Sequence, residues 1–319
     1  MSPTTWLLID DRAGNESQVR GVADALGLRI EIRDIAYTAA GALPNYILGD
    51  SLGGLTASSR VNLVPPWPDL VIAAGRRTAP VARYIKSKNG GKTFLTQLMY
   101  PGDTGLEDFD LIAVPNHDGI PDRPNLIHIT GAPHRVTADK LEVEARAWQG
   151  RFDDLSRPRI ALIVGGSTKR RTFTDEMAAE LARLASKMAM DRGGSLLVST
   201  SRRTGEAAAT LIDGISVPHH LFRWGDEGDN PYFAYLAMAD AVVVTGDSVS
   251  MCSEACATGR PVYIYAPKKL TTHKHAKLHT ELYEKGYARP LEGVLEDWTH
   301  PPLNAAQEIA AEIRKRMGI

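Results

Sequence analysis

Short apolar segments alternate with amphipathic helical segments along almost the whole chain, and this alternation limits the possible folds more than any other feature. Most of the apolar segments are continuous, which is typical of strands in a parallel sheet covered on both faces. The pattern runs through residues 5–149, is interrupted by the polar stretch 151–158, and then starts again. We therefore predict an α/β fold with two facing Rossmann-like domains.

The two halves contain similar numbers of predicted elements. In the first half, strands are expected at residues 5–10, 28–35, 69–75, 92–98, 110–114 and 125–129. In the second half, they are expected at residues 159–164, 195–200, 217–222, 241–245 and 261–265. Residues 37–66 are irregular and rich in glycine, serine and proline, which predicts an insertion or a long loop over one face of the sheet.

The charge balance and the lack of targeting segments restrict the function. Lysine plus arginine number 37 and aspartate plus glutamate 38, so no global field attracts nucleic acid. No segment resembles a signal peptide or a membrane span. We expect a cytoplasmic protein without a transmembrane segment, and peripheral membrane contact stays open. The only cysteines are Cys252 and Cys256, and the histidines of residues 273–279 lack further ligands at suitable spacing, so no metal is predicted.

The loops that follow the predicted strands hold the candidate site residues, because ligands of doubly wound sheets bind beyond the carboxyl ends of the strands. Asp11 and Glu16 lie in the first such loop, next to the start of a helix. They either face an acceptor or are solvated charges of a capped turn. Asn15 and Gln18 have the spacing of a capping box at this helix start.

Arg76 and Arg77 directly follow another predicted strand and open the next helix. Two cations at a helix start are unfavourable against the helix dipole unless an anion binds there. The pair is therefore a candidate for the anion or acceptor side, with a solvated surface pair as the alternative.

A glycine-rich loop follows the first strand of the second half. Gly165, Gly166 and Ser167 are followed closely by Lys169, and Arg202 lies in the loop after the next strand. Glycines let backbone amides approach a phosphate, and cationic side chains neutralise it. A plain basic turn is the alternative. The chain contains neither a G-x-G-x-x-G fingerprint nor a P-loop, and no cofactor is predicted.

Serines gather where the predicted strand 241–245 ends. Ser248 and Ser250 lie at the start of the next helix, and Glu254 lies about one turn further on. Hydroxyls at a helix N-terminus can hold a phosphate, and the carboxylate can hold ribose hydroxyls. The alternative is a helix cap with a structural glutamate.

The segments 230–240, 245–250 and 259–262 closely resemble the mitochondrial-fission Elm-type family. Other segments agree with this resemblance: residues 11–18, 75–79, 131, 134–136, 165–167, 200–204 and 286–293. Bacterial members are described as nucleoside-diphosphate-sugar epimerase-like, but this chain lacks the epimerases' glycine-rich fingerprint and a Tyr-x-x-x-Lys motif. The family resembles GT-B glycosyltransferases.

This resemblance implies a division of roles within a GT-B-like architecture. Residues 1–151 would form the acceptor-side domain and residues 152–303 the nucleotide-binding domain, while residues 304–319 would form a helix that returns to the N-terminal domain. The implied ligand is a nucleotide or nucleotide sugar. The donor-site residues carried over from the resemblance are Gly165, Gly166, Ser167, Arg202, Ser248, Ser250 and Glu254.

The expected activity is a metal-independent glycosyl transfer to an acceptor that the sequence does not identify. Loop amides and basic side chains would stabilise the leaving diphosphate. An inverting reaction needs a general base. We expect His134 in this role, with Asp11 and Glu16 as alternatives, and a structural role for His134 is equally open. The competing hypothesis is a non-catalytic adaptor that recruits partners, as the family name suggests for plant members.

Overall fold

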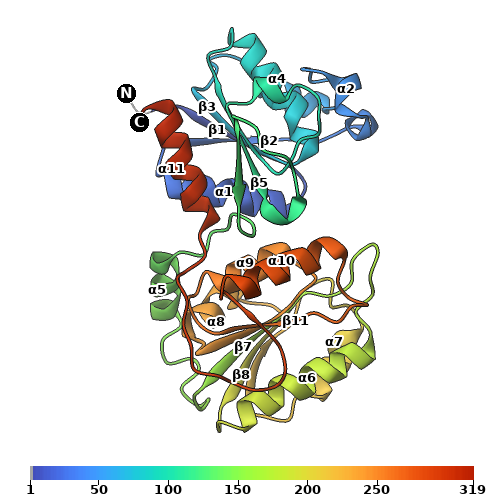
Figure 1. Ribbon diagram of the computed structural model, residues 1–319, viewed down its shortest axis with the longest axis vertical. Helices are drawn as coiled ribbons and strands as arrows, with labels where there is room; N and C mark the ends of the chain where they lie inside the picture. The colour runs from blue at the N-terminus through green and yellow to red at the C-terminus, as the bar shows by residue number, and fades with distance from the viewer. Residues whose placement is uncertain (1–2) are drawn as a thin grey trace. The chain divides into compact units, whose positions relative to one another are not determined.

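The computed structural model describes residues 3–319 and divides into two compact units (Figure 1). Unit 1 contains the described chain up to Arg135 together with Asn304–Ile319, and unit 2 contains Val136–Leu303. Each unit has its own six-stranded sheet in which all paired strands are parallel. The predicted α/β fold with two Rossmann-like sheets is confirmed.

The sheet of unit 1 has the strand order β2-β1-β3-β4-β5-β6. Its strands are β1 (Thr5–Ile9), β2 (Ile30–Asp34), β3 (Leu70–Ala74), β4 (Phe94–Leu98), β5 (Leu111–Pro115) and β6 (Leu126–Ile129). Every residue of β1, β3 and β5 is buried, as the continuous apolar sequence of these strands predicts.

Helices cover both faces of this sheet. On one face, α1 (Ala13–Leu26) and α11 (Ala305–Met317) share an apolar cluster with alternate residues of the strands. On the other face lies α4 (Ala79–Lys88). The capping-box prediction for α1 is wrong. The helix already begins at Ala13, and the Asn15 side chain donates to Asp10 instead of capping the helix.

The insertion predicted at residues 37–66 contains three short helices, η1 (Ala39–Ala42), α2 (Asn45–Leu48) and α3 (Ala57–Arg60). Leu55 and Leu63 anchor it in the apolar cluster beneath α4. The remaining short 3-10 turns of unit 1 are η2 (Arg76–Thr78), η3 (Leu106–Asp108) and η4 (Asn116–Asp118).

The sheet of unit 2 has the order β12-β11-β10-β7-β8-β9. Its strands are β7 (Arg159–Val164), β8 (Ser195–Thr200), β9 (His219–Phe222), β10 (Ala241–Thr245), β11 (Val262–Tyr265) and β12 (Arg289–Pro290). Counted from β7, this is the Rossmann order 3-2-1-4-5-6 read from the other edge, and the order reverses between β7 and β10. The two-residue strand β12 was not predicted.

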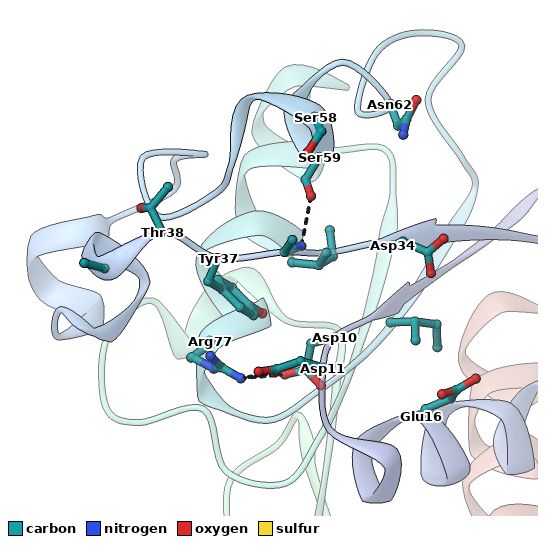
Figure 2. A pocket seen from close by; sticks show the side chains of 14 residues that line it. Asp10, Asp11, Glu16, Asp34, Tyr37, Thr38, Ser58, Ser59, Asn62 and Arg77 are labelled. Atoms are coloured by element: carbon teal, nitrogen blue, oxygen red, sulfur yellow. Dashed lines mark hydrogen bonds and ion pairs between the residues drawn. The ribbon is translucent and has the colours of Figure 1, made fainter.

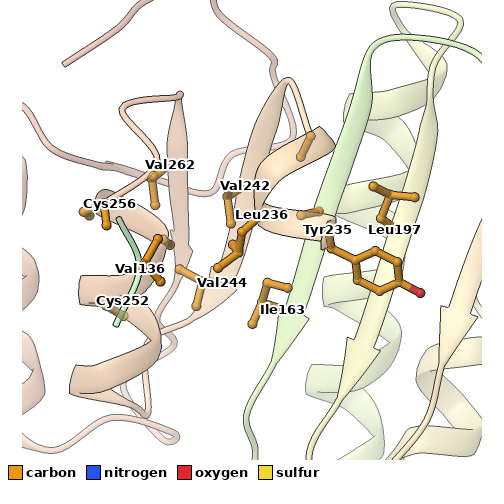
Figure 3. Close-up of a cluster of buried hydrophobic side chains, with 14 of the residues drawn as sticks. Val136, Ile163, Leu197, Tyr235, Leu236, Val242, Val244, Cys252, Cys256 and Val262 are labelled. Atoms are coloured by element: carbon orange, nitrogen blue, oxygen red, sulfur yellow. The ribbon is translucent and has the colours of Figure 1, made fainter. Parts of the chain in front are cut away.

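The helices of unit 2 also lie on both faces of the sheet. One face carries α6 (Asp175–Met190) and α7 (Ala207–Asp213). The elements on the other face are α5 (Ala138–Ala147), α8 (Tyr232–Met238), α9 (Val249–Cys256) and α10 (His273–Glu284). Figure 3 shows part of the apolar cluster on this second face, in which Cys252 and Cys256 are fully buried.

The chain passes from unit 1 to unit 2 between Arg135 and Val136, earlier than the predicted boundary at residues 151 and 152. The stretch 151–158 was expected to be a linker because of its polar character. However, Phe152 is fully buried, and its ring lies 5.6 Å from that of Tyr235. Spaced apolar residues within a polar stretch therefore tie this segment to unit 2.

Candidate functional site

Three loops meet at the carboxyl edge of the sheet in unit 2. They follow β7, β8 and β10, and the first and third flank the point where the strand order reverses. Ligands of Rossmann-like sheets bind at such a point. The loops contain Gly165–Ser167, Ser201–Thr204 and Gly246–Ser248.

Gly165 is held by both neighbouring loops through its backbone. Its amide donates to Thr245 Oγ1 at 2.7 Å, and its carbonyl oxygen accepts from Ser201 Oγ at 2.7 Å and from Thr204 Oγ1 at 2.6 Å. The hydroxyls that follow β8 and end β10 therefore fix the glycine-rich loop in place.

The side chain of Asp247 lies at the centre of the three loops. It is fully buried, and its Oδ2 atom accepts from the Gly166 amide at 3.0 Å and forms an ion pair with Arg203. The Ser167 amide in turn donates to the Arg203 carbonyl at 2.8 Å. These contacts make one connected arrangement from residues that are up to 81 positions apart.

Gly166 cannot be replaced by a larger residue without a shift of the backbone. Its φ is +142°, and a Cβ atom there would lie 2.1 Å from the carbonyl oxygen of Arg203. Only glycine combines this conformation with so close an approach.

The first turn of α9 lies next to Asp247. Ser248 is the N-cap, and its side chain accepts from the Met251 amide. The first amides of a helix have no partner within the helix, so those of Val249 and Ser250 are available to an anion. Ser250 is partly exposed in this turn. The predicted serines are therefore at the helix start, where one of them caps the helix.

Glu254 is separated from these amides by one turn of α9 and contacts α8. Tyr232 Oη donates to its Oε2 atom at 2.5 Å. Burial raises the pKa of Glu254 to about 7, and the hydrogen bond from Tyr232 opposes this shift. The carboxyl group of Glu254 thus has a structural partner in Tyr232.

Lys169 and Arg202 are exposed side chains of the loops after β7 and β8. Arg203, and not Arg202, turns inward to Asp247. Arg203 and Asp247 were missed as site residues. Their sequence signal was a doubled arginine and an acidic residue, each after a strand end, and neither pattern distinguishes an inward from an outward side chain.

In unit 1, the corresponding edge contains a buried carboxylate, Asp10. It accepts from Asn15 Nδ2 at 3.0 Å and from the Arg12 amide at 3.2 Å. Arg77 lies 3.5 Å from it, forms a closer ion pair with Asp11, and stacks 4.2 Å above the ring of Tyr37. Burial is the main cause that raises the pKa of Tyr37, and Asp10 adds to it.

A cavity of about 860 Å³ opens beside these residues (Figure 2). Four carboxylates and one guanidinium line it, together with a tyrosine ring and several hydroxyls. The charged lining residues are Asp10, Asp11, Glu16, Asp34 and Arg77. The predicted acceptor-side residues Asp11, Glu16 and Arg77 therefore share one acidic cavity.

The two predicted anion-binding arginines do not point to one place. Arg77 pairs with carboxylates, whereas Arg76 donates to the Leu43 carbonyl at 2.7 Å, the Asn45 side chain at 3.2 Å and the Ala42 carbonyl at 3.3 Å. Arg76 therefore holds the insertion onto the sheet edge.

The three proposed bases differ in exposure. His134 is 1% exposed and lies in the segment after β6, whereas the side chain of Asp11 is 69% exposed. Glu16 is partly exposed and pairs with Arg20 at 2.7 Å.

Within residues 3–319, no group of histidine, cysteine and acidic side chains has the arrangement of a metal site. No helix in this part of the chain is long and apolar enough to cross a membrane.

The two parallel sheets, one in each unit, are those of the GT-B-like fold, and solved proteins of this fold match almost the whole chain. A UDP-GlcNAc 2-epimerase from Methanocaldococcus jannaschii, solved with UDP-GlcNAc and UDP, is 13% identical and covers 99% of this chain and 100% of its own, with a TM-score of 0.55. A putative UDP-N-acetylglucosamine 2-epimerase from Listeria monocytogenes is 12% identical over 100% of this chain and 89% of its own, with a TM-score of 0.57.

Residues 13–317 match the sequence profile of the mitochondrial fission ELM1 family, and the chain belongs to this family. An uncharacterised protein of Rickettsia prowazekii is 28% identical over 97% of both chains. The mitochondrial fission protein ELM1 of Arabidopsis thaliana is 27% identical over 85% of this chain and 69% of its own. The family resemblance seen in the sequence is thus confirmed.

Proposed function

We propose that unit 2 binds a nucleoside diphosphate sugar at the loops after β7, β8 and β10. The observation that supports this most is the meeting of Gly166, Arg203 and the start of α9 at the strand reversal. Backbone amides at a helix N-terminus and a guanidinium are the groups that bind phosphate oxygens in proteins. Their joint placement fits a diphosphate.

The charges needed for a leaving diphosphate are present without a metal. Arg203 is partly exposed beside the helix start, and Lys169 and Arg202 are exposed on the neighbouring loops. Donors held in place, such as the helix amides and the anchored Arg203, stabilise charge as it develops in the transition state. We propose a metal-independent glycosyl transfer in which the bond between the sugar and the diphosphate breaks as an acceptor oxygen attacks.

A general base would take the proton from the acceptor hydroxyl. His134 is the first candidate, because a neutral imidazole nitrogen can accept a proton. Asp11 and Glu16 are the alternatives, because both line the acidic cavity. We propose only the chemical class of the acceptor, which is a compound with a free hydroxyl group.

Calorimetric titration with UDP, UMP and UDP-GlcNAc, with and without EDTA, tests this proposal. The UDP-bound neighbour of the same fold makes uridine nucleotides the first probes. We expect UDP and UDP-GlcNAc to bind more tightly than UMP, with no effect of EDTA. A screen in which no nucleoside diphosphate raises the melting temperature would contradict it, because a ligand at 100 times its Kd stabilises by about 2.7 kcal/mol.

The second candidate function is that of a non-catalytic adaptor. Its support is the Arabidopsis relative, which is named as a mitochondrial fission protein. Nucleotide binding alone fits both candidates. The release of free UDP from UDP-GlcNAc over time, measured with excess protein, distinguishes the two candidate functions. An enzyme that transfers or hydrolyses the sugar releases UDP, whereas a non-catalytic adaptor does not.

A further inference from the structure

Two aspartates flank strand β10 and make the same kinds of contact at its opposite ends. Before the strand, Asp240 accepts from the Arg159 amide at 2.7 Å and pairs with Arg157. After the strand, Asp247 accepts from the Gly166 amide at 3.0 Å and pairs with Arg203. Arg159 is the first residue of the neighbouring strand β7, and Gly166 lies in the loop two residues after that strand ends.

The two aspartates differ in burial and in how well their oxygens are satisfied. The side chain of Asp240 is 28% exposed, and each of its oxygens has a donor. The side chain of Asp247 is fully buried, and its Oδ1 atom has no donor among residues 3–319. A buried oxygen without a donor destabilises the fold, so stability alone does not explain this carboxylate.

The contacts of Asp247 leave part of the Arg203 guanidinium unused. Only Nη1 of Arg203 is engaged, by Asp247 and by the Gly166 carbonyl at 3.2 Å. Within the described chain, no acceptor contacts its Nε and Nη2 atoms, and the side chain is 30% exposed. A guanidinium held at one corner presents its other donors in a fixed orientation, which suits a phosphate.

We propose that Asp247 is a positioning residue, which orients the Arg203 guanidinium for the diphosphate of the ligand. This inference rests on the nucleotide site proposed above. It makes a prediction of definite sign. If Asp247 acted only through its charge, its removal would tighten anion binding. If it positions Arg203, its removal weakens binding, because the guanidinium loses its anchor.

The test compares Asp247→Asn with Asp240→Asn in titrations with UDP, UMP and uridine. For Asp247→Asn we expect UDP to bind about 10-fold more weakly. The affinity for UMP should fall by less, and the affinity for uridine should not change. Asp240→Asn removes an equivalent ion pair at the far end of the strands, so it should lower only the melting temperature. Asp247→Ser, which also keeps a small acceptor, replaces the asparagine variant if that variant does not fold.

A double-substitution cycle with Arg203→Gln separates positioning from a merely structural role. If Asp247 acts through Arg203, the double variant binds UDP no more weakly than Arg203→Gln alone. Additive losses, or UDP binding by Asp247→Asn that equals or exceeds that of the unaltered chain, would overturn the inference. If the unaltered chain binds no nucleotide, the proposed function itself fails, which is a distinct result.

Discussion

At the scale of single residues, Glu254 shows how burial raises the pKa of a carboxyl group. Its pKa of about 7 in the folded chain lies above its ordinary value of 4.5. The folded state therefore holds the proton more tightly, and the free energy of unfolding falls as the pH rises from about 4.5 to about 7. A shift of this size corresponds to roughly 3 kcal/mol.

Urea unfolding between pH 4.5 and pH 7.5 measures this effect against Glu254→Gln, which cannot titrate. We expect the unaltered chain to lose stability relative to the variant as the pH rises. If the free energies of unfolding of the two proteins depend on pH in the same way, the pKa of the Glu254 carboxyl group is not shifted. If Glu254 also holds ribose hydroxyls, the same variant binds UDP about 10-fold more weakly. Unchanged UDP binding would leave Glu254 a purely structural partner of Tyr232.

At the scale of elements, helix α1 packs closely against the segment that carries His134. A Cβ atom on Gly21 would lie 2.4 Å from the His134 carbonyl oxygen, whereas one on Gly14 of the same helix would contact nothing within 4 Å. Alanine favours a helix by up to about 1 kcal/mol over glycine. We therefore expect Gly14→Ala to be neutral or stabilising and Gly21→Ala to destabilise by about 1–3 kcal/mol.

Chemical denaturation of the two alanine variants provides the comparison. Helix propensity alone would favour Gly21→Ala, because Gly21 lies in the helix interior and Gly14 in the first turn, so a lower stability of Gly21→Ala reports the contact with the His134 segment. Equal stability of both variants would mean that this segment is free to move away from α1.

At the scale of the whole molecule, unit 1 is closed by the last helix of the chain. Ile309 and Ile313 of α11 are fully buried in the cluster shared with α1. Replacing a buried isoleucine with alanine costs about 2–5 kcal/mol. We expect Ile309→Ala to reduce hydrogen-exchange protection in unit 1, while Ile319→Ala, at a residue 49% exposed, has no such effect. Loss of protection confined to unit 2 would contradict this placement of the helix.

Much of the architecture could be predicted because strand burial is visible in local sequence. Residues 70–74 and 241–244 are continuous apolar runs, and both lie in buried central strands. The start of α1 was not predictable in the same way. Asparagine is a residue type that often caps helices, but the Asn15 side chain donates a hydrogen bond to Asp10 across the loop. The linker predicted at residues 151–158 was wrong for the same reason, because Phe152 packs against Tyr235, a partner far along the chain.

The sequence by itself determined the succession of strands and helices, and it placed glycine, serine and basic residues at the strand ends. It could do so because periodicity and turn chemistry are local properties. Only the tertiary structure decided that Arg203 rather than Arg202 meets Asp247, and that Arg77 pairs with Asp11 while Arg76 holds the insertion. The direction of a loop side chain depends on partners far along the chain, which parallel strand pairing alone brings to the same edge.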